Sequence, residues 1–265
     1  MLLLVLALPV ATMAQHTPEA APLVLVAHRG VVNDTLLENS LSSLEETIRR
    51  GYTHIEVDLR STKDGHAVCL HDQNLNRTVG VDANIDEITL AELRAVASAE
   101  LVPTFETFCA RSQGRIHLMP DIKETPPDLE EAFGASIEAS MVKYGLMTEA
   151  LVIGQSAVVD RFLGKARIRW REPLAVVEQA AREMENPGAH YFIFNHAADF
   201  NRAEVEGFHK LGLDVVVSIN TFHYREGDPV AQGVRDIEKM LALGVDGLQI
   251  DAVYDSFLFD FLISH

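Results

Sequence analysis

The sequence predicts a single-domain (β/α)₈ barrel, an α/β fold, and three observations lead to this prediction. The chain has 265 residues, 48% of them hydrophobic, and barrels of this class have about 250 residues in one domain. From residue 23 to the C-terminus, short apolar runs alternate with longer stretches of helical periodicity, which is typical of parallel βα units. Eight of these runs have the length of strands, and eight parallel strands close naturally into a barrel. An open, doubly wound sheet remains an alternative, because the number of strands does not establish closure.

The predicted elements follow one another in the order of such a barrel. The first strand covers residues 23–28, and an amphipathic helix follows over residues 38–50, with Gly51 as its C-cap residue. The second strand covers residues 54–59. The remaining six strands are predicted at IHLMPDI near Ile116, ALVIG near Leu151, RIRW near Ile168, YFIF near Tyr191, DVVVSI near Val215 and DGLQI near Leu248.

A short insert lies between the second and third of these strands. It contains the segment AVCLHD, which follows a hairpin turn at Asp64 and Gly65, and the helical segment TLAELRAV. The insert is too small to form a domain of its own, and no linker rich in Pro, Gly or Ser divides the chain. We therefore expect one barrel domain over residues 23–265.

The N-terminal residues, MLLLVLALPVATMA, form an apolar run that ends in small residues. Thr12 and Ala14 have the spacing that signal peptidase requires, which predicts a signal peptide over residues 1–14 and a periplasmic or secreted protein. The alternative is a segment that is disordered or packed on the core, because no basic residue precedes the run. No later stretch of about 18 apolar residues predicts a membrane span.

The charge balance restricts the class of partner. The chain has 22 Lys and Arg residues against 39 Asp and Glu residues, a net charge of −17. No run of basic residues could follow a nucleic-acid backbone, so we expect no nucleic-acid partner, and no feature predicts an obligatory protein partner. An anionic substrate would have to be held locally, by a metal ion or by a few well-placed cations.

The chain has two cysteines, Cys69 and Cys109, so a single intramolecular disulfide is possible. Cys69 lies in an alternating apolar segment, for which a buried free thiol is the simpler interpretation. We predict no catalytic role for either cysteine.

Acidic side chains gather where the first strands of the predicted barrel end. Glu56 and Asp58 are two residues apart on one strand, so they share a face, while their apolar neighbours face the helices. Two carboxylates in one dry space repel each other and require a cation or protons. Asp121, at the end of the next strand, could complete a set of oxygen ligands, which predicts one divalent cation, Mg²⁺ or Ca²⁺. The alternatives are strand carboxylates that face solvent and a loop ion pair between Asp121 and Lys123.

Two histidines suit acid–base chemistry near neutral pH, because free imidazole titrates near a pKa of about 6.5. His28 ends the first strand and His71 lies in the insert. Hydrolysis of a diester requires one group to accept a proton from the attacking hydroxyl and another to protonate the leaving alkoxide. Arg29 and Lys123 could stabilise charge on the phosphoryl oxygens, and Asp72 is expected to orient His71 or to form a turn. Which histidine is the base stays open.

Several short motifs together resemble a known family. VAHRG, LLENS, HIEVDLRSTKDGHAVCLHD, NRT, TLAELR and VPTFET resemble, in order and spacing, the signature of glycerophosphodiester phosphodiesterases, while the second half contributes only GQS, VSIN and GVDGLQID. The resemblance implies a metal-dependent phosphodiesterase on a (β/α)₈ barrel that hydrolyses glycerophosphodiesters to glycerol phosphate and an alcohol. It implies catalysis by His28 and His71, substrate binding by Arg29, Lys123, Glu38 and Asn39, and a metal held by Glu56, Asp58 and Asp121.

Three departures from the family pattern leave the substrate open. Asp121 stands where the family usually carries Glu, and it resembles the third ligand of spider-venom sphingomyelinase D-like phospholipases. Val217 stands where a Trp is common, and Ala252 follows Asp251 where Pro is usual. Asn220 and Gln155 are weak candidates for substrate contacts and fit a structural role equally well.

Two alternatives to the glycerophosphodiester hypothesis follow. The first is a phospholipase D-like enzyme acting on headgroups of phospholipids, lysophospholipids or sphingolipids, with transient contact with a lipid surface. The only sequence feature that favours it is the C-terminal YDSFLFDFLISH, for which we prefer a helix packed on the barrel. The second is a catalytically silent phosphate-binding barrel, against which His28 and His71 argue.

Overall fold

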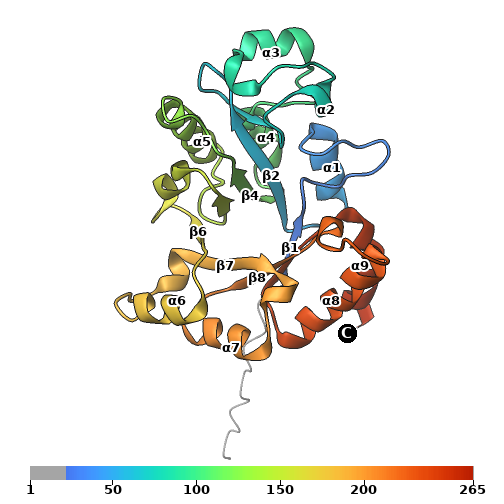
Figure 1. Cartoon of the computed structure of the whole chain (residues 1–265), viewed down its shortest axis with the longest axis vertical. Coiled ribbons are helices and arrows are strands. Elements are labelled where there is room, and N and C mark those ends of the chain that lie inside the picture. Colours follow the sequence, from blue (N-terminus) through green and yellow to red (C-terminus); the bar gives the residue numbers. More distant parts are fainter. Residues whose placement is uncertain (1–21, 265) are drawn as a thin grey trace, which may run out of the picture.

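Eight parallel strands form a closed barrel in the computed structural model, which describes residues 22–264. β1 pairs with β9 and also with β2, so the eight parallel strands form a ring, and the open sheet is excluded. Figure 1 shows the helices around this ring. The parallel strands are β1 (Val24–Ala27), β2 (His54–Ser61), β4 (His117–Ile122), β5 (Leu151–Gly154), β6 (Arg167–Trp170), β7 (Tyr191–His196), β8 (Val215–Ile219) and β9 (Gly247–Ile250). All eight predicted strands are confirmed.

Helices form the outer layer of the barrel. The predicted helix over residues 38–50 begins at Leu41, where the Ser40 side chain accepts from the Ser43 N–H, and Gly51 follows it with φ 83°. Residues 38 and 39 belong instead to the loop before this helix. The α-helices are α1 (Leu41–Arg49), α2 (Asn76–Val79), α3 (Leu90–Val96), α4 (Phe105–Ser112), α5 (Glu130–Lys143), α6 (Leu174–Ala181), α7 (Arg202–Lys210), α8 (Pro229–Leu243) and α9 (Asp255–Ser264).

The predicted insert forms a hairpin and two short helices beside β2, at the top of Figure 1. β3 (Ala67–Cys69) pairs antiparallel with the end of β2, after the predicted turn, where Gly65 has φ 78°. α3 begins with a capping box between Thr89 and Glu92. A separate small apolar cluster holds the insert together. The hairpin thereby fixes the segment that carries His71.

Side chains alternate along the strands between two apolar layers. On β2, Ile55, Val57 and Leu59 belong to the large cluster between barrel and helices. The interior of the barrel is filled by a smaller cluster that includes Met119 and Phe194. Residues on the inner face near the C-terminal strand ends therefore project above this inner cluster and into the mouth of the barrel.

Several predictions made outside the strands can be compared with the structure. α9 packs on the large cluster through Leu258, which has 0% exposure, so the C-terminal segment is the predicted packed helix. Cys69 and Cys109 are buried free thiols. Within residues 22–264, no helix combines the length and the apolar composition needed to cross a bilayer. The predicted signal peptide over residues 1–14 lies outside the described residues.

Candidate active site

Three carboxylates converge at the mouth of the barrel. Glu56 and Asp58 lie on the inner face of β2, and Asp58 pairs in register with Asp121 of β4. One oxygen from each of the three lies within 4.8 Å of the others. Glu56 is 2% exposed and Asp58 is 1% exposed, so the alternative of solvent-facing carboxylates is excluded. Burial, together with the nearby Asp58 and Asp121, holds the pKa of Glu56 well above its ordinary value.

Two basic side chains offset part of this negative charge. Lys123 Nζ lies 2.6 Å from an oxygen of Asp58 and 2.6 Å from an oxygen of Asp121, while Arg29 Nε lies 3.3 Å from Asp58. Although burial opposes them, Lys123 and Arg29 lower the pKa of Asp58 to about 2. Although burial also disfavours the charge of Lys123, Asp58 and Asp121 raise its pKa. The ion pair of Asp121 and Lys123 is therefore part of the carboxylate cluster and not an isolated loop contact.

His28 is oriented by an acid from the last strand. Its Nδ1 lies 2.7 Å from Oδ1 of Asp251, so Nδ1–H donates to the carboxylate and Nε2 is left for chemistry. Asp251 is itself fixed, because Thr221 donates to its other oxygen from the backbone N–H and the hydroxyl, each at 2.7 Å. Although burial opposes it, the hydrogen bond from His28 lowers the pKa of Asp251. A carboxylate held in this way fixes the orientation and the tautomer of the His28 ring.

His71 has an equivalent partner next to it in the sequence. Its Nδ1 lies 2.6 Å from Oδ1 of Asp72, as predicted for an orienting residue. Hydrogen bonds from Arg77 and then from His71 lower the pKa of Asp72. Arg77 also donates to Glu38 at 2.6 Å, and Glu38 accepts from Arg29 at 3.1 Å. A chain of charged contacts therefore joins His71 to the loop after β1.

The loop after β1 is tied to the carboxylates by the backbone N–H of Arg29 and by the side chain of Asn39. Arg29 and Asn39 have φ angles of 57° and 59°, a region that residues other than glycine rarely adopt. In this conformation the N–H of Arg29 donates to Glu56 at 2.8 Å. The Asn39 amide donates to Asp58 at 2.8 Å and accepts from the Asp58 N–H at 3.0 Å. Asn39 and Glu38 therefore position charged groups at the mouth, and their contact with substrate stays a prediction.

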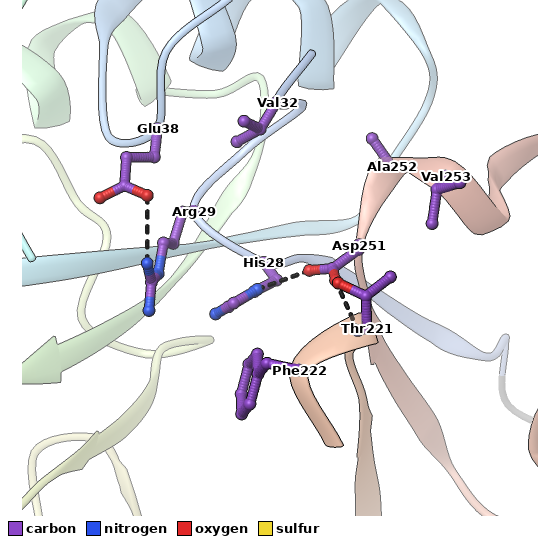
Figure 2. Close-up of a pocket in the computed structure, with 9 residues that line it drawn as sticks. All are labelled: His28, Arg29, Val32, Glu38, Thr221, Phe222, Asp251, Ala252 and Val253. Atoms are coloured by element: carbon purple, nitrogen blue, oxygen red, sulfur yellow. Dashed lines mark hydrogen bonds and ion pairs between the residues drawn. The ribbon is translucent and has the colours of Figure 1, made fainter. Parts of the chain in front are cut away.

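Two cavities adjoin these groups. Figure 2 shows the first, of about 350 Å³, in which the side chains of His28 and Phe222 lie across from the Arg29–Glu38 pair. The second has a volume of about 250 Å³ and lies next to Asp121 and Lys123. The first is lined by His28, Arg29, Val32, Glu38, Thr221, Phe222, Asp251, Ala252 and Val253. The second is lined by Arg60, Gln73, Asp121, Lys123, Glu124 and Gln155.

Sequence reasoning missed two contributors to the mouth. In the sequence, Asp251 stands out only as the end of the motif GVDGLQID, yet it is the partner of His28. Its position could have identified it, because it lies two residues after Gln249 and so on the same inner face of β9. Thr221, which holds Asp251, carried no signal. Asn220 is fully buried and donates to Asp251 at 3.1 Å, which gives it a structural role.

Replacing Asp251 by Asn is expected to lower any turnover at this site by about 10²- to 10⁴-fold, because the amide cannot hold His28 in the tautomer that presents Nε2. Steady-state kinetics would show the loss in kcat with KM little changed. Asp214→Asn is a matched control, since Asp214 pairs with Arg167 outside the mouth. A kcat within threefold of the wild-type value in Asp251→Asn, with thermal unfolding unchanged, would remove the positioning role.

Comparison with known proteins places the chain in a family. The model of the Glycerophosphoryl diester phosphodiesterase family matches residues 28–254. Probable glycerophosphodiester phosphodiesterase 2 of Mycobacterium tuberculosis is 34% identical over 85 residues, which cover 31% of this chain and 32% of that protein. A human lysophospholipase D is 31% identical over 99 residues, which cover 37% of this chain and 31% of that protein. These two matches thus span about a third of each relative. A glycerophosphodiester phosphodiesterase of Caldanaerobacter subterraneus is 24% identical over 247 residues, covering 86% of this chain and 93% of that protein.

Solved structures share the fold. A glycerophosphoryl diester phosphodiesterase from Parabacteroides distasonis superposes with a TM-score of 0.70 and 18% identity, covering 91% of this chain and 87% of that one. A phosphodiesterase from Oleispira antarctica, in complex with its product sn-glycerol-3-phosphate, has a TM-score of 0.68 and 19% identity over 89% of this chain and 96% of that one. Because the family model matches most of the sequence, the chain belongs to the glycerophosphoryl diester phosphodiesterase family.

Proposed function

We propose that this chain is a phosphoric diester hydrolase that cleaves glycerophosphodiesters into glycerol phosphate and an alcohol. The observation that carries the proposal is the pair of imidazoles, His28 and His71, each with Nδ1 on a carboxylate, beside the buried acidic cluster. Family membership supports it, as does the glycerophosphodiester phosphodiesterase of Caldanaerobacter subterraneus, of which the matched region covers 93%. The product named for the Oleispira antarctica protein, sn-glycerol-3-phosphate, supports the same product class.

The acidic cluster fits a divalent cation. Glu56, Asp58 and Asp121 offer only hard oxygen donors, two of them are buried, and Lys123 and Arg29 leave the pKa of Glu56 raised. These donors suit Mg²⁺ or Ca²⁺. When bound, such an ion neutralises charge on a phosphoryl oxygen and polarises the phosphorus toward attack. Asn39 and the N–H of Arg29 hold two of the three donors in place.

The two histidines divide the proton transfers. With Nδ1 donated to a carboxylate, each presents Nε2 as the reactive nitrogen. One neutral imidazole accepts the proton of the attacking hydroxyl as its oxygen forms a bond to phosphorus. The other, protonated, donates to the leaving alkoxide as the bond between phosphorus and the alcohol oxygen breaks. Arg29 and Lys123 stabilise charge on the phosphoryl oxygens. If the hydroxyl belongs to the substrate's own glycerol, a cyclic phosphate forms first and water then opens it.

Turnover of a panel of diesters tests the proposal directly. Phosphorus NMR would follow glycerophosphocholine, glycerophosphoethanolamine and intact lysophosphatidylcholine with the wild-type protein, first in EDTA and then with Mg²⁺ or Ca²⁺ added back. We expect release of glycerol phosphate that EDTA abolishes and metal restores. A protein that binds metal but converts none of the diesters would favour the silent phosphate-binding barrel.

An apolar rim favours a second candidate, a phospholipase D-like activity on lysophospholipids. Val32, Leu37, Phe222 and Val253 are 41%, 52%, 59% and 50% exposed, and three of them line the cavity that contains His28. Apolar side chains left exposed around a site provide contacts for an acyl chain or a lipid surface. One relative is a lysophospholipase D, which is consistent with this rim.

The double variant Val32→Ser/Val253→Ser tests this rim. If an acyl chain packs there, kcat/KM for lysophosphatidylcholine should fall by about tenfold, because two apolar contacts are lost, while glycerophosphocholine should be unaffected. Val142→Ser is the matched control, since Val142 is 63% exposed on α5 and lines neither cavity of the mouth. An equal effect on both substrates would exclude an acyl contact at the rim.

A further inference from the structure

The proposed chemistry assigns no role to Arg169, a cation on the inner face of the barrel. Arg169 is the third residue of β6, and its neighbour Ile168 belongs to the large cluster between barrel and helices. Because side chains alternate along a strand, Arg169 faces the barrel interior. Its guanidinium carbon lies 5.4 Å from the ring centroid of Phe194, a member of the inner cluster. The guanidinium therefore covers part of the floor of the mouth.

The sheet register brings Arg169 to the level of the acidic cluster. Asp121 of β4 pairs with Ile153 of β5, and the β5–β6 register, in which Val152 pairs with Ile168, puts Arg169 beside Ile153. Adjacent strands lie about 4.8 Å apart, so the backbone of Arg169 lies about 10 Å from that of Asp121. Arg169 therefore lies two strands from the acidic cluster, where a small molecule bound at the cluster can extend a second group toward its guanidinium.

Within the described residues, the side-chain hydrogen-bond partner of Arg169 is neutral. Its Nη2 donates to the neutral Asn195 side chain at 2.6 Å, and its Nε is buried without a hydrogen-bond partner. Among residues 22–264, no carboxylate oxygen lies within 4.0 Å of its guanidinium nitrogens, although the chain has 39 acidic residues. Burial, and then the nearby Arg171, lower the pKa of Arg169, while the charges of Asp121 and Asp199 act in the opposite direction. The guanidinium stays charged. A partly buried cation that no carboxylate contacts directly is stabilised when an anion binds to it.

We propose that Arg169 binds a second anionic group of the substrate, a carboxylate or a phosphate monoester on the alcohol arm of the diester. The inference rests on the proposed function, because the acidic cluster and Lys123 place the scissile phosphate. The cavity of about 250 Å³ beside Asp121 and Lys123 gives the alcohol arm room next to the acidic cluster, and its lining includes the cation Arg60 as well as the carboxylate of Glu124. Alcohol arms that end in a cation, such as choline or ethanolamine, gain nothing from Arg169. The substrate class is therefore a glycerophosphodiester with an anionic headgroup.

Headgroup selectivity of Arg169 variants tests this assignment. We would measure kcat/KM for glycerophosphoserine, for a glycerophosphoinositol phosphate and for glycerophosphocholine with the wild-type protein, Arg169→Gln, Arg169→Lys and the control Arg202→Gln. Arg202 lies on the outer helix α7, with a side chain 63% exposed. Arg169→Gln should lower the values for the two anionic headgroups by about 10- to 100-fold and leave glycerophosphocholine within about threefold. Arg169→Lys should retain part of the preference, and the substrate that loses more identifies the anionic group.

The outcomes separate this inference from the proposed function. Equal losses on all headgroups, or no loss, would overturn the role of Arg169 while leaving the hydrolase intact. If the wild-type protein converts no diester, the proposed function fails, and the inference is then decided by calorimetric binding of the same diesters to His71→Ala protein with Mg²⁺ or Ca²⁺. In that assay Arg169→Gln should weaken only the anionic diesters, and equal affinities would contradict the assignment.

Discussion

Alanine at His28 or at His71 is expected to lower kcat for glycerophosphodiesters by about 10²- to 10⁴-fold, the usual contribution of a positioned acid or base. Each imidazole has its Nδ1 on a carboxylate, so neither Asp72 nor Asp251 can take over the proton transfer from the position of Nε2. The kcat of the double variant should be little lower than that of the less active single variant, because the two residues act in one sequence of proton transfers. Initial rates by phosphorus NMR would measure all three.

The pH dependence of the single variants identifies the roles. Removal of the base should abolish the acidic limb of the pH–rate profile, and removal of the acid should abolish the basic limb. His209→Ala is the control, because His209, in the last turn of α7, pairs with Asp246, which directly precedes β9 and so lies at the end of the barrel opposite the mouth. A single variant that keeps kcat within threefold of the wild-type value would exclude that histidine from catalysis, and retention by both would require a different mechanism.

Glu56→Gln is expected to abolish metal binding and turnover while stabilising the metal-free protein. Glu56 is one of three clustered carboxylates and the one whose pKa is held well above its ordinary value by burial, Asp58 and Asp121. Neutralising it removes repulsion within the cluster and also removes a metal ligand. For the wild-type protein, metal at 100 times its Kd should add about 2.7 kcal/mol, which corresponds to a rise in Tm of roughly 5–10 °C for a domain near this size.

Thermal unfolding in EDTA and with added Mg²⁺ or Ca²⁺ measures both effects. Glu56→Gln should unfold at a higher temperature than the wild-type protein in EDTA and should show no further rise with metal. Glu131→Gln, at an 84% exposed side chain on α5, is the matched control and should behave as wild type. If the metal-dependent rise in Tm survives in Glu56→Gln, the three carboxylates are not the metal site.

The sequence by itself determined the features that depend on local pattern. Short apolar runs between helical stretches predicted all eight barrel strands, because the periods of strand and helix are set by the backbone. The same two-residue period predicted that Glu56 and Asp58 share a face, since apolar residues occupy the positions between them. Asp72 follows His71 directly, so this pair too could be recognised along the chain.

The tertiary structure alone decided the features that join distant segments. Closure depends on the pairing of β1 with β9 and β2, and it brings Asp251 to His28 across 223 positions of sequence. It also places Arg169 level with Asp121 through the intervening β5, where no local pattern marks it. The physical reason is that a strand's period fixes only which face a side chain takes. Its neighbours on that face are fixed by strand order, register and barrel closure, which the whole core determines.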